Sequence, residues 1–95
     1  MKLEYTEKAV SEIESILSHI AQDNPPAAAA VASALRVAAA RICSFPLIGA
    51  KTSEPSVHVK IARPYHYLIF YGVNNDVLTI RNVRHPASRP LIRSH

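Results

Sequence analysis

The chain has 95 residues, of which 48% are hydrophobic, so it should form one small domain with a single packed core over 1–95, not a disordered tail. Its two glycines exclude the glycine-rich loops that bind phosphates, and its single cysteine, Cys43, excludes an intrachain disulfide and a cysteine-rich zinc site. Residues 45–95 carry seven Lys/Arg against two Asp/Glu, whereas residues 1–44 carry four against five, which suits a nucleic acid or an acidic protein segment as partner but also serves solubility.

The N-terminal half predicts one strand and two helices. Residues 2–5 alternate polar and apolar side chains, as in a short strand. Thr6 is a suitable cap for a helix of about four turns whose apolar residues share one face. Asn24 and Pro25 are suited to the cap and first position of a second, alanine-rich helix that ends near Cys43. The two helices should form an antiparallel hairpin.

The C-terminal half predicts three strands after a loop that runs to Pro55. The first strand is expected over 57–62, and the second, over 65–73, is aromatic, with Tyr65, Tyr67 and Tyr71 on one face. A turn at 74–76 leads to the third strand, 77–83, where spacing places Arg81, Val83 and His85 on one face. The order β-α-α-β-β-β indicates an α+β fold in which the helix hairpin packs on a small antiparallel sheet.

Five segments of the chain, in this order, resemble the RelE/ParE superfamily of toxins from type II toxin–antitoxin systems. The resemblance covers nearly the whole chain and implies the superfamily's fold. The segments are Tyr5-Thr6-Glu7-Lys8-Ala9, Asp23-Asn24-Pro25-Pro26-Ala27-Ala28, Phe45-Pro46-Leu47-Ile48-Gly49, Tyr67-Leu68-Ile69-Phe70-Tyr71-Gly72-Val73 and Val83-Arg84-His85-Pro86-Ala87-Ser88-Arg89-Pro90. One departure is His58, near the start of the strand expected over 57–62, where the superfamily usually has an arginine.

The resemblance implies one of two mechanisms. RelE-like members cut mRNA on the ribosome, and a metal-independent cleavage of this kind needs a base, an acid and cations around one phosphate. The candidates for these roles are Lys60, Arg63, Arg81 and His85. RelE-like chains usually have a tyrosine near the C-terminus, whereas the last tyrosine here is Tyr71.

ParE-like members share the fold but poison DNA gyrase by binding, without ribonuclease activity. The segment 85–90 and the start of the second helix resemble this branch, so we favour gyrase inhibition with no catalytic residue and with His85 in a structural role. The expected partner-binding residues are Arg84, Arg89 and Arg93, together with exposed residues of the helix hairpin. A third possibility is an inactive module that binds nucleic acid or protein without toxicity.

The resemblance also implies a cognate antitoxin encoded beside the toxin, as in plasmid-stabilisation modules. An acidic, amphipathic antitoxin tail should fold along the helix hairpin and the sheet edge. The resulting hetero-oligomer should contact DNA mostly through the antitoxin's own domain. The sequence shows no signal peptide, and its low-charge stretch 25–35 is too short to span a bilayer, so we expect a cytoplasmic protein. No metal or cofactor is expected.

Overall fold

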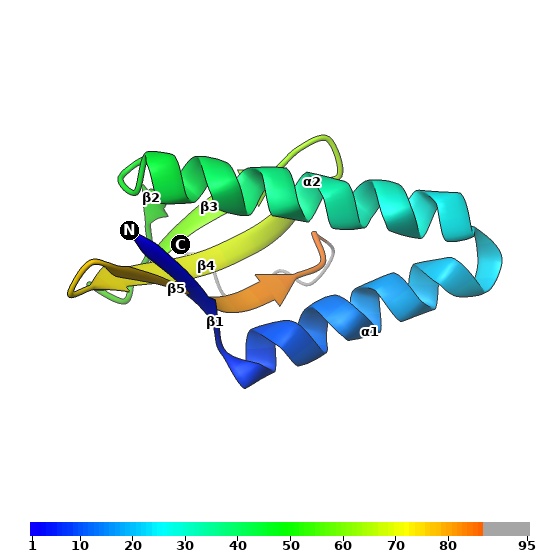
Figure 1. Ribbon diagram of the computed structural model, residues 1–95, viewed down its shortest axis with the longest axis horizontal. Coiled ribbons are helices and arrows are strands. Elements are labelled where there is room, and N and C mark those ends of the chain that lie inside the picture. The colour runs from blue at the N-terminus through cyan, green and yellow to red at the C-terminus, as the bar shows by residue number, and fades with distance from the viewer. Residues whose placement is uncertain (87–95) are drawn as a thin grey trace.

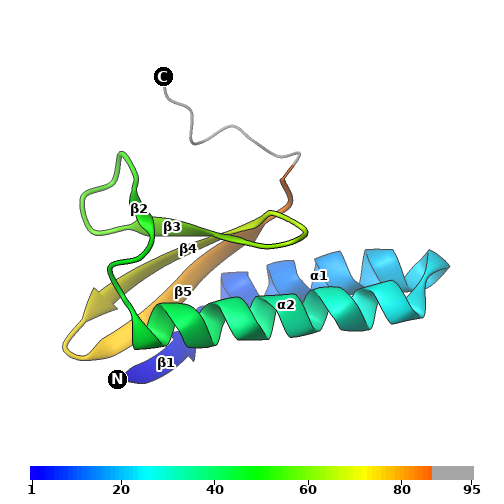
Figure 2. The same cartoon turned by 90° about the horizontal axis from the view of Figure 1, so that it is seen from above.

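The computed structural model describes residues 1–86, which form a layer of two helices against one sheet (Figure 1, Figure 2). The predicted order β-α-α-β-β-β is confirmed, with one additional two-residue strand, β2, inside the segment expected to be a loop. The elements are β1 (Lys2–Tyr5), α1 (Glu7–Asp23), α2 (Pro25–Ser44), β2 (Ala50–Lys51), β3 (His58–Ala62), β4 (Tyr67–Asn74) and β5 (Val77–Arg84).

Both predicted helix caps are confirmed. Thr6 Oγ1 accepts a hydrogen bond from the Ala9 N–H at 3.0 Å, and Asn24 Oδ1 accepts one from the Ala27 N–H at 3.1 Å. Each cap satisfies a backbone donor that has no partner within its helix. The Thr6 hydroxyl also donates to the Arg81 carbonyl at 2.9 Å. The first cap therefore also fastens the start of α1 to β5.

The sheet has the strand order β1-β5-β4-β3-β2 and is mixed, not purely antiparallel as expected. Strands β2 to β5 pair antiparallel, whereas β1 pairs parallel with β5 along its whole length. The helix hairpin brings the chain back to the end of the sheet where β1 began. The meander β3–β4–β5 then leaves its third strand running in the direction of the first. The parallel pair is thus a consequence of the hairpin.

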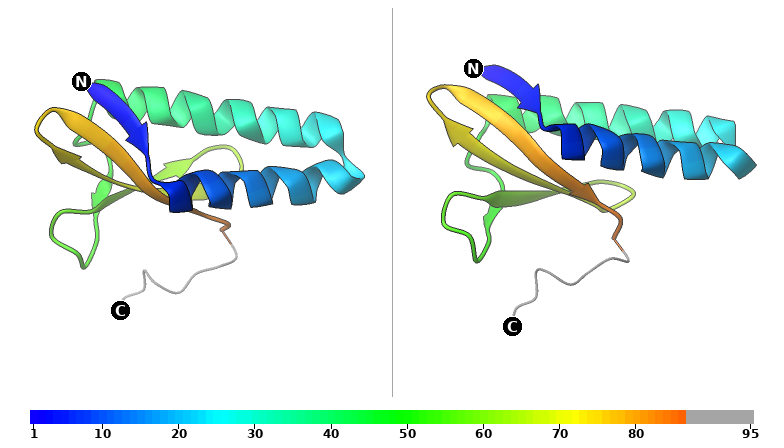
Figure 3. Two further views of the ribbon diagram at one scale, coloured as in Figure 1. Left: turned by 60° about the horizontal axis from the view of Figure 1, so that its bottom comes forward. Right: turned by 90° about the horizontal axis from the view of Figure 1, so that it is seen from below.

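The core lies between the helices and one face of the sheet. From the sheet it contains Ile69 and Tyr71 of β4 and Leu78, Ile80 and Val83 of β5, all buried. The buried helix residues are Ala9, Val31, Leu35, Ala38, Ala39 and Ile42. By length and composition α2 could cross a membrane, and in this fold 33% of its most apolar window is buried, with Val31, Leu35 and Ile42 in the core. Within residues 1–86 no helix covers the other face of the sheet (Figure 3).

The strand register decides which side chains of β3 face the helices. His58, Lys60 and Ala62 lie opposite Tyr71, Ile69 and Tyr67, which are buried beneath the helices. Because paired residues in a sheet point to the same face, His58, Lys60 and Ala62 face the helix layer. The β-branched residues Val59 and Ile61 face the other way. The basic side chain of Lys60 is thereby placed beside α2.

Tyr71 fastens the segment after α2 to the sheet. Its hydroxyl donates to the Pro46 carbonyl at 2.7 Å and accepts from the Gly49 N–H at 3.0 Å. A Cβ at position 49 would lie 2.6 Å from the Tyr71 hydroxyl oxygen and 2.9 Å from the Val59 carbonyl oxygen, so this close approach requires glycine. Burial raises the pKa of Tyr71, and the hydrogen bond from Gly49 opposes that effect.

Two details of the predicted strands were wrong. The register between β4 and β5 shifts so that Phe70 pairs with Asn82 and Tyr71 with Ile80, leaving Arg81 unmatched. Such a bulge breaks the two-residue period, and Arg81 is exposed whereas Val83 is buried. Tyr65 lies in the turn before β4 and is 39% exposed, so it does not share the buried face of Tyr67 and Tyr71.

Candidate partner-binding clefts beside helix α2

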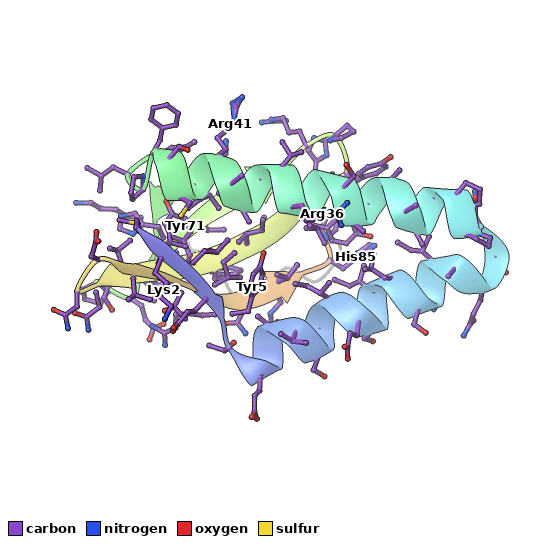
Figure 4. The ribbon with its side chains drawn as sticks, viewed as in Figure 1. Lys2, Tyr5, Arg36, Arg41, Tyr71 and His85 are labelled. Carbon is purple, nitrogen blue, oxygen red and sulfur yellow. The ribbon has the colours of Figure 1, made fainter. Side chains whose placement is uncertain are left out.

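An apolar cleft of about 330 Å³ opens between α1 and α2. Its walls come from the two helices and the end of β1, and its floor is the buried face of β4 and β5. Figure 4 shows Tyr5 and Arg36 in the opening between the helices. The lining residues are Tyr5, Val10, Ile13, Glu14, Leu17, Ala32, Leu35, Arg36, Ile69, Ile80 and Val83. We call this site the apolar cleft.

Much of the surface of the apolar cleft is open to solvent. Tyr5 is 39% exposed and Val10 is 42% exposed, and both line the cleft. Burial raises the pKa of Tyr5, and the positive charge of Arg36 opposes this effect. The phenol is therefore neutral at physiological pH and can donate a hydrogen bond. The cleft thus offers apolar contact with polar groups at its rim, as grooves that receive amphipathic helices do.

A second cleft, of about 180 Å³, lies on the opposite flank of α2, between this helix and β3. It contains three cationic side chains from three segments, Arg41, Lys60 and Arg63, and no acidic residue among its described lining. The guanidinium of Arg63 lies 3.2 Å from the ring Nε2 of His66. The remaining lining residues are Ala34, Val37, Ala38, Ile61 and Ala62. We call this site the basic cleft.

A third cleft, of about 220 Å³, lies between α1 and the ends of β4 and β5. His19 and His85 line it together with Tyr67, whose ring meets that of His85 edge to face at a centroid distance of 5.4 Å. Burial raises the pKa of the Tyr67 phenol. His19 was not among the residues singled out from the sequence, although its helical spacing from Ile16 and Ile20 places it beside the apolar face of α1.

None of the three clefts is lined by all four residues proposed for RNA cleavage. Lys60 and Arg63 line the basic cleft, His85 lines the histidine-containing cleft beside α1, and Arg81 occupies the bulge at the β5 edge. A nuclease site would need its acid, base and cations around one phosphate. Over residues 1–86 there is also no group of three or more His, Cys, Asp or Glu residues that could hold a metal ion.

The predicted partner-binding arginines are only partly described. Arg84 is half-buried at the end of β5, opposite Leu68, on the sheet face turned away from the helices. Arg89 and Arg93 lie outside the described residues. Arg41 and Val10, which line the two clefts beside α2, were not singled out from the sequence.

No curated protein matches the chain. Among solved structures, the chromosomal ParDE toxin–antitoxin system from P. aeruginosa is similar, with a TM-score of 0.78 and 17% sequence identity over 90% of this chain and 95% of that one. At that identity the similarity shows the fold. The family model described as the ParE toxin of the type II toxin–antitoxin system parDE matches residues 3–90. This chain therefore belongs to the ParE toxin family of type II toxin–antitoxin systems.

Proposed function

We propose that this toxin inhibits DNA gyrase by binding it, and that a cognate antitoxin neutralises it. The observation that carries the proposal is the match to the ParE family model over residues 3–90. None of the three clefts is lined by Lys60, Arg63, Arg81 and His85 together, which supports a binding mechanism over RNA cleavage. A protein that inhibits gyrase by binding needs only a surface complementary to gyrase. It does not need an acid, a base and cations placed around one phosphate. Toxin and target would meet in the cytoplasm.

The apolar cleft supports the antitoxin part of the proposal. Open apolar surface at the edge of a core commonly marks a protein interface. An antitoxin tail that folds on binding would place the apolar face of a helix against Val10 and Leu17 and exclude water from the cleft. The result would be a hetero-oligomer in which the antitoxin supplies the DNA-binding domain, as expected for a plasmid-stabilisation module.

A supercoiling assay with added antitoxin tests both parts together. Purified, antitoxin-free toxin is incubated with gyrase and relaxed plasmid, and the antitoxin encoded beside it is then titrated in. We expect the toxin to inhibit supercoiling and the antitoxin to restore it near a fixed molar ratio. Undiminished supercoiling at saturating toxin would contradict gyrase as the target. Inhibition that the antitoxin does not relieve would contradict neutralisation by this partner.

A further inference from the structure

We propose that the turn after α2, Phe45-Pro46-Leu47-Ile48, is a contact through which the toxin binds gyrase, with its exposed apolar side chains inserted into a pocket of that enzyme. We call these four residues the apolar turn. This inference rests on the proposed inhibition of gyrase and assigns that activity a surface. Three observations carry it: the exposure of two side chains, the attachment of the turn to the core, and the cations on both sides of it.

The apolar turn exposes two large apolar side chains within three residues. Leu47 is 84% exposed and Phe45 is 64% exposed, the two largest values among the large hydrophobic residues that the structure describes as exposed. Neither residue lines any of the three clefts described above. Single exposed apolar residues are common, whereas apolar side chains exposed together indicate an interaction site. A partner that covers both would remove this surface from water.

The backbone of the apolar turn is held in one conformation. The Phe45 carbonyl accepts a hydrogen bond from the Ile48 N–H at 3.0 Å, which closes a β-turn with Pro46 and Leu47 at its two central positions. Proline suits the first of these positions because its ring fixes φ. The buried Tyr71 hydroxyl donates to the Pro46 carbonyl at 2.7 Å and so attaches the turn to the core. Binding through such a turn would lose little conformational entropy.

The position and shape of the apolar turn suit a folded partner. It lies where α2 ends, at the end of the molecule that also contains the turn between β4 and β5 (Figure 1, Figure 2). A tail that folds on binding needs a groove, such as the apolar cleft between the helices. A protruding turn can instead enter a concave pocket on a protein that is already folded, as gyrase is. The turn therefore fits the target better than the antitoxin.

Cations lie on both sides of the apolar turn. Arg41 precedes it by one helical turn and accepts the Phe45 N–H at its carbonyl at 2.9 Å, and Lys51 follows it in β2. Both side chains are exposed, and residues 41–53 contain no acidic residue. A pocket with an apolar interior and an acidic rim would complement this surface. A symmetric contact between two toxins at the turn would bring like charges together, which disfavours a second copy as the partner.

The apolar contact is tested with the double variant Phe45→Ser, Leu47→Ser in the gyrase supercoiling assay. The toxin concentration that gives half-maximal inhibition should rise about 30- to 100-fold, because both anchoring side chains are removed. The control is Tyr65→Ser, which removes an aromatic side chain that is 39% exposed in the turn between β3 and β4. It should change that concentration by about twofold or less. Both variants should bind the antitoxin as the wild type does, since none of these residues lines the apolar cleft.

The acidic rim is tested with the double variant Arg41→Gln, Lys51→Gln. Surface plasmon resonance on immobilised gyrase should show association about 3 to 10 times slower than for the wild type at low salt, with little change in dissociation. High salt should remove the difference, because it screens exposed charges. Equal association rates at low salt would overturn the assignment of an acid-rimmed pocket.

A footprint of the wild-type toxin tests the same contact without any substitution. Hydroxyl radicals oxidise exposed side chains, so Phe45 and Leu47 should react readily in the free toxin. Their oxidation should fall when gyrase is bound and stay unchanged when only the antitoxin is bound. This measurement stands even if a substituted chain does not fold.

The outcomes separate this inference from the proposed function. Failure of the wild-type toxin to bind and inhibit gyrase would overturn both. Equal inhibition by the wild type and the Phe45→Ser, Leu47→Ser variant, with no protection of the turn by gyrase, would overturn the inference alone. Protection by the antitoxin and not by gyrase would overturn it and assign the turn to the antitoxin. Self-association of the wild type that this variant loses, with gyrase inhibition unchanged, would assign the turn to a second copy.

Discussion

The two clefts that flank α2 differ in chemistry although they share a helix. The apolar cleft continues the core to the surface, since Ile69, Ile80 and Val83 form its floor. The basic cleft has about half the volume and is lined by alanines and cations. Neighbouring residues of α2 point about 100° apart, so Leu35 and Arg36 line the first cleft and Ala34 and Val37 the second.

This difference indicates two kinds of recognition on one scaffold. Burial of apolar surface in the apolar cleft would supply most of the free energy of antitoxin binding, at roughly 25 cal/mol per Å². The charges of the basic cleft would mainly select an acidic partner and speed its association.

The largest effect is expected at the apolar cleft. Val10→Glu should weaken antitoxin binding about 100-fold, because the complex would bury a carboxylate without a partner. The toxin alone should keep its stability, since Val10 is 42% exposed. Titration calorimetry measures the affinity of the variant for the antitoxin. The control is Ser11→Glu, at an exposed neighbouring position outside the lining of the cleft. Equal affinities of the two variants would show that the antitoxin does not use the cleft.

The next effect concerns the fastening of α2 to the sheet. Tyr71→Phe should lower the free energy of unfolding by about 2 kcal/mol, because the Pro46 carbonyl and the Gly49 N–H lose their shared partner. Urea denaturation gives this value. The control is Tyr65→Phe, at a 39% exposed position, which should cost about 0.5 kcal/mol or less. Equal losses of unfolding free energy in the two variants would mean that the buried Tyr71 hydroxyl contributes no more than the exposed one.

A smaller effect is expected where α1 meets β5. Glu12 Oε1 accepts a hydrogen bond from the Val83 N–H at 2.8 Å, on the helix that forms one wall of the apolar cleft. Glu12→Ala should cost about 1–2 kcal/mol of stability, and Glu12→Gln less, because the amide oxygen is still an acceptor. Glu14→Ala, at the exposed rim, is the matched control. A loss as large for Glu14 as for Glu12 would contradict this role.

The smallest effect is a dependence on alkaline pH. Burial raises the pKa of Tyr5, Tyr67 and Tyr71, so the folded chain holds these protons after the unfolded chain has begun to lose them. Stability is therefore fully present below the unfolded pKa, near pH 10, and falls as the pH rises towards the folded values. Urea unfolding at roughly pH 8 and pH 10.5 should show the fall, and Tyr71→Phe should make it shallower. Stability that rises with pH would contradict the direction of these shifts.

The elements of the fold that the sequence predicted depend on local signals. Thr6 and Asn24-Pro25 mark helix starts through their own side chains, and both caps formed as expected. The parallel pairing of β1, the two-residue β2 and the bulge at Arg81 depend on contacts between distant segments. β2 in particular follows Gly49, whose position is set by Tyr71, 22 residues further along the chain.

The candidate site was predictable only in outline. The basic C-terminal half and the helix hairpin contain the surfaces on which the clefts lie, but the basic cleft also uses Arg41 from the other half of the chain. Tyr5 and Val10 resemble ordinary apolar residues of a strand and a helix, and single exposed apolar residues are common. Only the folded arrangement of the hairpin against the sheet brings Tyr5 and Val10 together in the lining of one cleft.

The most direct test of gyrase as the target follows two activities of the purified toxin in parallel. One reaction contains gyrase and supercoiled plasmid, and the other contains ribosomes translating a defined mRNA. We predict that cleaved DNA is trapped with gyrase and that the mRNA stays intact. His85→Ala should trap cleaved DNA equally well, because inhibition of gyrase by binding needs no catalytic histidine. Cleaved mRNA with unaffected gyrase, and loss of that cleavage in His85→Ala, would contradict it and identify a ribosome-dependent nuclease.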